Sequence, residues 1–234
     1  MGFAIANYPI HTIAQRDLSF TSVIGRSGDS IVDNKRYKNV DMPIYQINSI
    51  PHLVKADNKY ELEKELLDWL NTKSGDYGKL YDTTILGYFC YAVCTGISEI
   101  VTTNLNKYLS TSIQFNRKPF WYSDEGQETV ETTSQEFELL NPETLESEPY
   151  IKVKGSGRIY LYVNEEKFSL DVDEYIELDT ELQTAFKGTE NQNTCVDCDY
   201  MPVFKSGTNN IRIVYKPSTA SFNGVEIIPR WRRL

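Results

Sequence analysis

The sequence predicts a mainly β protein, in which an N-terminal α+β domain precedes an antiparallel β-sandwich. Tyrosine is unusually common, with 16 copies in 234 residues, and aromatic enrichment favours strands. One amphipathic helix stands out in the first half, whereas short alternating segments without helices fill the second half. A chain of this length suits one large domain or two of roughly 100–120 residues.

The helix is expected over about residues 58–72. Four apolar residues recur there at helical spacing and would line one face: Leu62, Leu66, Trp69 and Leu70. Asp57 or Asn58 can cap the start, and Gly75 suits the chain just beyond the end. We expect Trp69 to be largely buried against the sheet of the first domain. Alternation over Met42–Ile47 and Tyr88–Cys94 predicts strands, so this domain should be a sandwich- or barrel-like sheet with one helix.

The second half alternates throughout. Between Arg158 and Val163 the aliphatic residues face one way and the tyrosines the other, and the alternation resumes from Phe168 to Val172. Asn164 tolerates a positive φ, so a hairpin turn is expected between these strands. Further short strands are expected at Tyr175–Leu178, Ile211–Tyr215 and Gly224–Ile228. Strands at this spacing without helices indicate an antiparallel sandwich.

Charge is distributed unevenly along the chain. Thirty-three acids against 24 bases give a formal charge of −9, which disfavours binding to nucleic-acid backbones. Nine of the acids and no Lys or Arg lie between Ser123 and Pro149. We interpret this stretch as an inter-domain segment, partly extended, that opens the second domain, with a solvated pair of surface strands as the alternative. It divides the chain into domains of residues 1–125 and 126–234.

Targeting and membrane signals are not expected. The start has no basic region followed by an apolar run, so it does not resemble a secretory signal. The densest apolar stretch, Ile85–Cys94, is far shorter than the ~20 residues of a spanning helix. The sequence therefore predicts a soluble chain without a membrane partner.

Motifs that carry catalysis are not recognisable. Neither His11 nor His52 lies in a protease or metallohydrolase pattern. Gly155 and Gly157 begin a dinucleotide-like pattern, but a strand follows, so we interpret them as a turn before the hairpin. Asp171 and Asp173 have calcium-loop spacing without its later ligands, which favours a strand. Carboxylate pairs at glycosidase spacing cannot be singled out among 33 acids. We predict no catalytic residues, no cofactor and no enzyme activity.

The cysteines are the best metal candidates. Cys195 and Cys198 have zinc-binding spacing, and Cys90 with Cys94 would complete four ligands. Residues four apart on a strand lie ~13 Å apart, however, and the two pairs belong to different predicted domains. We expect free thiols and no metal site.

Several motifs in order resemble one family. In the first half they are Gly25-Arg26-Ser27-Gly28-Asp29, the helix ending at Asp68-Trp69-Leu70, Lys79–Asp82, and Ile113–Tyr122 with its Pro119, Phe120 and Tyr122. In the second half they are Asn141-Pro142, Glu148–Ile151, Gly155-Ser156-Gly157, Met201-Pro202-Val203-Phe204, Ser206-Gly207-Thr208-Asn209 and Ile228-Pro229-Arg230-Trp231-Arg232. From about residue 20 to 234 the chain resembles the distal tail protein (Dit) family of long-tailed phages of Gram-positive bacteria. It departs from that pattern in a short start and in Asn164-Glu165, where an Asn-Gly turn is usual.

The resemblance implies a structural role at the distal end of a virion tail. Such proteins form a homohexameric ring, the hub of the baseplate, assembled in the cytoplasm of the host bacterium. The ring joins the tail tube to the tail-associated lysin or fibre and to the receptor-binding protein or its adaptor. The first domain would build the ring and the second would be a galectin-like sandwich. DNA would only pass through the lumen, which we expect to be neutral or acidic, with Arg230, Arg232 and Arg233 away from it.

Two alternatives belong to other classes. A galectin-like sandwich could be a carbohydrate-binding module, with Tyr160, Tyr162 and Tyr175 as stacking platforms. Galectin-type sugar sites use a cluster that includes histidine, and the second half of the chain has no histidine. A cell-wall hydrolase is the third possibility, and it would require one carboxylate whose replacement abolishes activity.

Overall fold

The computed structural model describes residues 3–5, 11–25, 27–49, 59–70, 76–103 and 108–234. The chain divides into two compact units. The N-terminal unit comprises Met1–Asp82, Cys90–Phe120 and Leu234, and the C-terminal unit comprises Thr83–Phe89 and Trp121–Arg233. The division lies at Phe120, inside one long strand, whereas the sequence predicted a boundary at residue 125. No helix among the described residues is long and apolar enough to cross a membrane.

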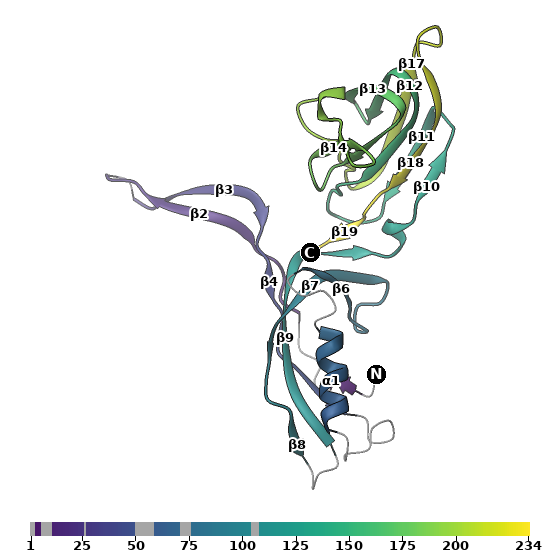
Figure 1. Ribbon diagram of the computed structural model, residues 1–234. Helices are drawn as coiled ribbons and strands as arrows, with labels where there is room; N and C mark the ends of the chain where they lie inside the picture. The colour runs from purple at the N-terminus through teal and green to yellow at the C-terminus, as the bar shows by residue number, and fades with distance from the viewer. Residues whose placement is uncertain (1–2, 6–10, 26, 50–58, 71–75, 104–107) are drawn as a thin grey trace. The chain divides into compact units, whose positions relative to one another are not determined.

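The N-terminal unit is built on an antiparallel sheet (Figure 1). Its strand order is β1 (Phe3–Ile5), β5 (Tyr45–Ser49), β9 (Tyr108–Ser123), β7 (Tyr88–Ile97) and β6 (Gly78–Tyr81). The short strands β4 (Val40–Asp41) and β8 (Val101–Thr103) also pair with β9. β19 (Arg232–Arg233) pairs with Trp121 and Tyr122 at the end of β9, within the C-terminal unit. The alternation that predicted strands at Met42–Ile47 and Tyr88–Cys94 is confirmed by β5 and β7. β9 is the central strand because five other strands pair with it along its two edges.

Alternate residues of β9 form the core of this unit. Ile113 and Phe115 are buried on one face, and Tyr45 and Ile47 of β5 are buried beside them in the register Tyr45↔Ile113. Arg117 is also fully buried on this face, where its guanidinium donates to the carbonyl oxygens of Thr12, Lys118 and Pro119. Those three bonds compensate the desolvation of a charge that would otherwise be costly to bury.

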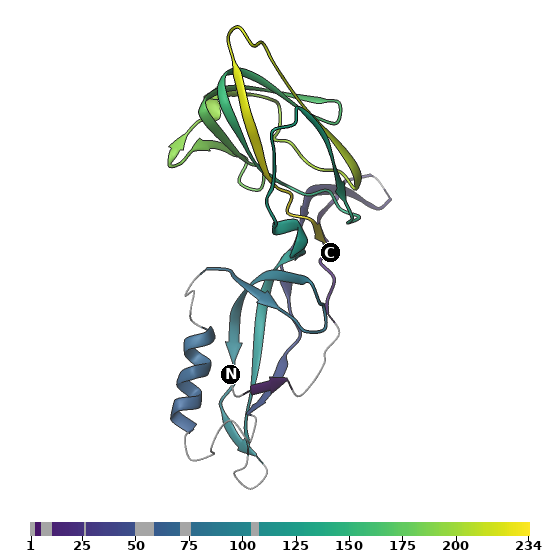
Figure 2. The same ribbon diagram turned by 90° about the vertical axis from the view of Figure 1, so that its right-hand side faces the viewer.

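Helix α1 (Lys59–Leu70) runs alongside this sheet (Figures 1 and 2). The predicted helix is confirmed, although residues 58, 71 and 72 lie outside the described residues. Leu66 is its buried anchor, with 2% of its surface exposed. Trp69 is partly exposed and meets Phe115 edge-on at 6.3 Å between ring centroids. Most of its surface is covered, as expected, although a groove of about 570 Å³ opens beside it.

We expect Leu66→Ala to destabilise the N-terminal unit by about 2–3 kcal/mol, the lower part of the range for buried leucines, because the groove gives the helix room to settle. Leu67→Ala is the matched control, since Leu67 is the next residue and is 38% exposed. Chemical unfolding followed by far-UV circular dichroism would measure both. Equal losses for the two variants would show that the helix face is assigned incorrectly.

Strands β2 (Arg16–Ser22) and β3 (Asp29–Tyr37) form a separate two-stranded sheet. They pair antiparallel with the register Phe20↔Ile31, and a bulge interrupts the pairing between Arg16 and Leu18. Figure 1 shows them as a long hairpin, which we call the arm. The sequence analysis did not predict the arm.

The C-terminal unit is an antiparallel β-sandwich organised by one long hairpin. β12 (Tyr150–Val163) and β13 (Glu166–Asp179) pair along their whole length, from Tyr150↔Asp179 to Val163↔Glu166. The other strands are β10 (Val130–Thr132), β11 (Glu136–Asn141), β14 (Thr184–Lys187), β15 (Glu190–Asn191), β16 (Val196–Asp197), β17 (Gly207–Tyr215) and β18 (Ser221–Ile228). The predicted sandwich and the turn at Asn164, whose φ is 57°, are confirmed.

Glycines allow β12 to bend, so that its two halves pair with different strands of the sandwich. Its first half pairs with β18 and its second half with β17, with a bulge between Lys154 and Gly155. Gly157 has a φ of 77°, and a Cβ there would lie 2.3 Å from the carbonyl oxygen of Thr219. The interpretation of Gly155 and Gly157 as a turn before the hairpin is therefore wrong: they form a bend within one strand.

The acidic stretch Ser123–Pro149 belongs to the C-terminal unit. Within it β10 pairs with β18, and β11 pairs with β17. The stretch begins next to the division at Phe120, so it opens the C-terminal unit as expected, and its two strands fit the alternative of surface strands. In both strands exposed residues alternate with partly covered ones, and only Asn141 is buried, which explains the low apolar content of the stretch.

Candidate functional site: the exposed arm and the C-terminal clasp

The arm presents large apolar side chains to solvent. Phe20 and Ile31 lie opposite each other and are 62% and 61% exposed, and Ile24 in the connecting turn is fully exposed. Val23 and Val32 are also exposed. A two-stranded hairpin alone is at best marginally stable in water, and a cluster of exposed apolar side chains indicates an interaction surface.

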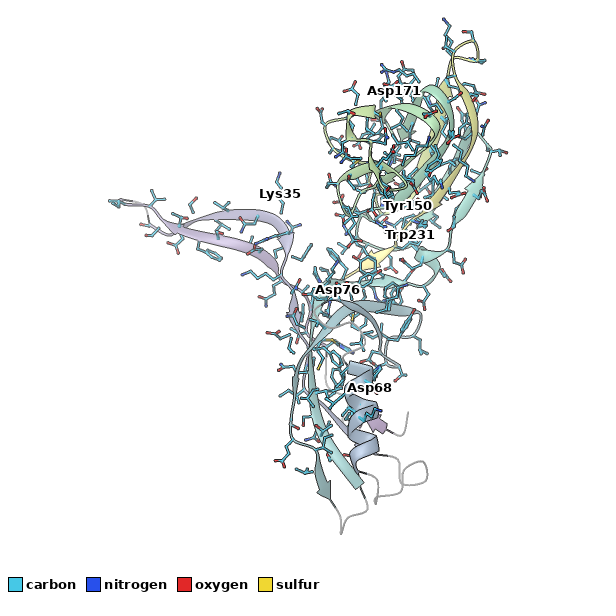
Figure 3. The ribbon with its side chains drawn as sticks, viewed as in Figure 1. Lys35, Asp68, Asp76, Tyr150, Asp171 and Trp231 are labelled. Atoms are coloured by element: carbon cyan, nitrogen blue, oxygen red, sulfur yellow. The ribbon has the colours of Figure 1, made fainter. Side chains whose placement is uncertain are left out.

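Ion pairs hold the end of the arm opposite this turn. Arg16 pairs with Asp33 across the strands, and Arg36 donates to Asp17 at 2.7 Å. The hydrogen bond from Arg36 holds the pKa of Asp17 below its ordinary value. Lys35, labelled in Figure 3, has a φ of 55° and donates its backbone N–H to Asp33. Charge is thus paired near the base of the arm, while the exposed apolar residues Phe20, Ile24 and Ile31 lie toward its turn.

Gly25, Ser27 and Gly28 of the predicted motif lie in the turn of the arm. Gly25 and Gly28 have φ values of 81° and 91°, which glycine adopts without strain. Arg26 lies outside the described residues. The role of these glycines is therefore to reverse the chain.

A second group of predicted residues gathers at one end of the sandwich. Asn141 and Asn209 are both buried and organise loops through their side-chain amides. Asn141 donates to the carbonyl oxygens of Leu145 and Phe204, and Asn209 donates to those of Lys205 and Gly207. Gly207, with a φ of 85°, pairs with Asn141. Pro142 is exposed.

The last residues close over this end, and we call residues 229–233 the clasp. Arg230 donates twice to Asp179, at 2.7 and 2.9 Å, and Arg232 donates to Glu148 at 2.7 Å. Burial disfavours ionisation of Asp179, yet the bonds from Arg230 outweigh it and hold the pKa of Asp179 below its ordinary value.

Trp231, labelled in Figure 3, fills the centre of the clasp. Its ring lies 5.8 Å from that of Phe204, and a Cβ on Gly126 would lie 2.4 Å from its backbone nitrogen. The carbonyl oxygens of Pro229 and Pro202 accept from Ser147 and Thr180. The clasp therefore packs against the C-terminal unit and stabilises its fold.

The remaining predicted residues lie on β9. Pro119 accepts from Arg117, and Phe120 meets Tyr37 edge-on at 5.6 Å. Tyr122 stacks on Phe89 at 5.7 Å. The motif residues therefore fall at the turn of the arm, on α1, on β9, at the bend of β12 and around the clasp, and they do not converge on one cavity.

Groups with catalytic or metal-binding chemistry are used structurally. His11 Nε2 lies 3.3 Å from Asp82, which also accepts from Tyr45; His52 lies outside the described residues. Burial raises the pKa of the Cys90 thiol to about 12, so it is protonated at neutral pH. Cys195 donates to Gln192 at 3.0 Å. No group of three or more potential metal ligands occurs among the described residues.

The predicted calcium-like pair lies on a strand, as expected. Asp171 accepts two hydrogen bonds from Arg158, and Asp173 pairs with Lys187 at 3.2 Å. Both carboxylates have cationic partners from neighbouring strands. The strand interpretation of Asp171 and Asp173 is confirmed.

Sequence reasoning missed the apolar residues of the arm. A signal was present, because Phe20 and Ile31 flank a Gly-rich turn at hairpin spacing. The segments on either side mix charged and apolar residues without strict alternation, so no strand was predicted there.

The fold matches solved structures of phage tail proteins. The SPP1 Dit protein (gp 19.1), described as a paradigm of the hub adsorption apparatus in phages that infect Gram-positive bacteria, aligns over 96% of this chain and 92% of its own, with a TM-score of 0.66 and 7% identity. Chains of the phage P2 baseplate in its activated conformation with Ca and with Sr align over all of this chain and 91% of theirs, with TM-scores of 0.47 and 0.48 and identities of 12% and 11%.

Comparisons of the sequence itself found no relative. No family model matches the chain, and none of the curated proteins does. The alignment with SPP1 Dit extends across both units. The chain thus has the mainly β, two-unit fold of a Dit-like phage tail protein.

Proposed function

We propose that this chain is a structural subunit of a phage tail tip, a baseplate hub protein that assembles into a homohexameric ring. The observation that carries the proposal is the arm, whose apolar residues Phe20, Ile24 and Ile31 are exposed in the single chain. Burying one such side chain contributes about 1.5–3 kcal/mol. The fold shared with SPP1 Dit supports the same assignment.

An arm favours a ring over a two-fold dimer. When an element of one subunit binds a different surface of the next, the contact is heterologous, and its repetition gives a ring when the rotation closes and an open filament when it does not. The number six comes from the resemblance of the sequence motifs to the Dit family. In this ring the N-terminal units form the contacts between subunits.

The partners follow from this position in the particle. The ring would join the tail tube protein on one side to the tail-associated lysin or fibre, and to the receptor-binding protein or its adaptor, on the other. DNA would pass through the lumen without specific binding. The protein would be assembled in the cytoplasm of the host bacterium and act at the distal end of the tail.

The carbohydrate-binding alternative is less well supported by the side chains it needs. Lys167 Nζ lies 4.1 Å from the ring centre of Tyr160, and Arg212 lies 4.5 Å from that of Tyr162. Tyr175 has Lys152 at 4.1 Å. Cations therefore cover the tyrosine faces on which a sugar would stack.

The assignment predicts where the protein lies in the virion. Glu165, in the exposed turn between β12 and β13, can accept an inserted epitope tag. Gold-labelled antibody should then mark the tail end opposite the head in electron micrographs. Label on the head, or intact infectious tails that contain no copy of the protein, would contradict the assignment.

A further inference from the structure

The C-terminal unit has one long strand with an unpaired edge. Among its outermost strands, β10, β15 and β16 have three residues or fewer, whereas β11 has six. Among the described residues β11 pairs with β17 alone, in a regular register from Glu136↔Arg212 to Asn141↔Gly207. We call the side of β11 away from β17 the open edge. A strand edge of this length can accept a further strand.

The hydrogen bonds between β11 and β17 fix the direction of each backbone group. In an antiparallel ladder, residue pairs that exchange N–H···O bonds alternate with pairs whose N–H and C=O groups point away from each other. Ile213 donates its N–H to the carbonyl oxygen of Gln135. Two residues further along β11 the same pattern recurs, so Phe137 and Leu139 direct their backbone groups toward β17.

The alternate residues of β11 direct their backbone groups toward the open edge. They are Glu136, Glu138 and Leu140, and all three are exposed. The carbonyl oxygen of Glu136 accepts from the hydroxyl of Ser134 at 2.7 Å, as expected for a group that does not face β17. The open edge thus offers a row of N–H and C=O groups at the spacing of a strand.

The usual protections of an edge strand are missing from β11. Proteins commonly protect such an edge with Lys, Pro or a bulge. From Glu136 to Asn141 β11 has neither Lys nor Pro, and its register is uninterrupted. Two copies of β11 paired with each other would bring the carboxylates of Glu136 and Glu138 together, and like charges across strands are destabilising. The open edge therefore disfavours a second copy of itself.

The carboxylates of Glu136 and Glu138 have no ion pair among the described residues. Glu131, in the same acidic stretch, pairs with Lys154 at 2.9 Å. Arg212 lies opposite Glu136 on β17, but its guanidinium lies over a tyrosine ring 4.5 Å away. Two exposed acids beside an open edge favour a partner that carries cations.

A groove of about 420 Å³ lies next to these two acids. It extends from β11 to the turn at Asn164, and Asn210 of β17 contributes to its lining. A residue of an added strand that faces Glu138 could extend a long side chain into this groove. The acids in the lining favour Lys or Arg in that position.

We propose that the open edge binds an extended segment of another protein by strand addition, with Lys or Arg facing Glu136 and Glu138 and an apolar residue facing Leu140. Main-chain hydrogen bonds give such a complex its affinity, and alternate side chains give it specificity. Antiparallel addition continues the pairing of the sheet, so the bound segment has the pattern apolar–x–basic–x–basic. The inference goes beyond the proposed ring, because it concerns the C-terminal unit alone.

The test uses a fluorescent peptide in which one valine and then two lysines alternate with threonines. Its binding to the full-length chain is measured by fluorescence anisotropy. In antiparallel addition the N–H groups of the lysines face β11, and those of the threonines face solvent. One derivative is therefore N-methylated at both lysines, and its matched control is N-methylated at two threonines.

The lysine peptide should bind saturably with a Kd below about 1 mM. N-methylation of the lysines should weaken binding at least about tenfold, and N-methylation of the threonines by less than about threefold. A peptide with glutamate in place of lysine should not bind. No saturable binding of the lysine peptide, or equal losses for the two methylated peptides, would overturn the inference.

Substitutions in the protein separate the backbone from the charge. Leu140→Pro removes an N–H that faces the open edge and not β17, so it should abolish binding while the fold persists, which circular dichroism checks. Leu140→Thr is its control. Glu136→Gln/Glu138→Gln should weaken binding about tenfold and remove its dependence on salt. Unchanged binding by a folded Leu140→Pro variant, or by the glutamine variant, would overturn the inference.

Native mass distinguishes a foreign segment from a second copy of the chain. Wild type and Leu140→Pro should have the same mass at every concentration. A lower mass for Leu140→Pro would show that a second copy occupies the open edge, and would overturn the inference. A wild-type protein that forms no ring would count against the proposed function only, because peptide binding is measured per chain.

Discussion

Replacement of the two opposed apolar residues of the arm, Phe20→Ser/Ile31→Ser, should convert the proposed ring to monomers without unfolding the chain. Each side chain is more than 60% exposed in the single chain, so little packing within the subunit is lost. In the ring each would be covered by the neighbouring subunit, and losing both should cost about 3–5 kcal/mol at every contact. That corresponds to at least about a hundredfold weaker association per contact.

A swap at the neighbouring opposed pair provides the control. Thr21→Ser/Ser30→Thr exchanges two polar residues in the same hairpin and should leave the ring intact. Light scattering after gel filtration measures the mass, and circular dichroism checks the fold. A Phe20→Ser/Ile31→Ser protein that still assembles at micromolar concentration would show that the arm is not the contact between subunits.

Loss of the buried ion pair in the clasp should give the largest change in stability. Arg230→Met keeps the length of the side chain but leaves Asp179 buried without its cation. We expect a loss of about 3 kcal/mol from the C-terminal unit, the lower end for broken buried pairs, because 19% of the Arg230 side chain is still exposed. A Trp69→Phe background makes the fluorescence of Trp121 and Trp231 report guanidinium unfolding of this unit.

The exposed pair Arg158–Asp171 is the control, because it has the same two-bond geometry with both side chains about half exposed. Arg158→Met should cost no more than about 1 kcal/mol. Similar losses for Arg230→Met and Arg158→Met would contradict the assigned role of the clasp.

The Arg230 effect should depend on pH in one direction. The folded-state pKa of Asp179 lies below its unfolded value of about 3.9. The stabilisation by the pair is therefore complete well above pH 4 and is lost as the pH falls through the folded-state pKa. The difference between wild type and Arg230→Met should shrink in acid.

The sequence predicted the sandwich better than the N-terminal unit, for physical reasons. In β12 and β13 one face is buried and the other exposed, so alternation around Asn164 is strict. Gly155 and Gly157 were assigned to a turn because two nearby glycines occur both in turns and in bent strands. The close approach of Thr219, which distinguishes the two cases, is visible only in the structure. The low apolar content of Ser123–Pro149 suggested a linker, although half-buried strands such as β11 need only every second residue to be apolar.

Features that depend on distant residues could not be predicted. The burial of Arg117 depends on the carbonyl oxygen of Thr12, and that of Arg230 on Asp179, across separations that one sequence does not reveal. The spacing places Leu66 and Trp69 on one apolar face of α1, but it does not reveal that Leu66 is the more deeply buried of the two.

The native mass of the purified full-length chain tests the central claim most directly. At tens of micromolar, native mass spectrometry should give six times the chain mass of 26.9 kDa, and negative-stain images should show six-fold rings. A mass of one chain at every concentration, together with failure to form rings when purified tail-tip proteins are added, would contradict the account.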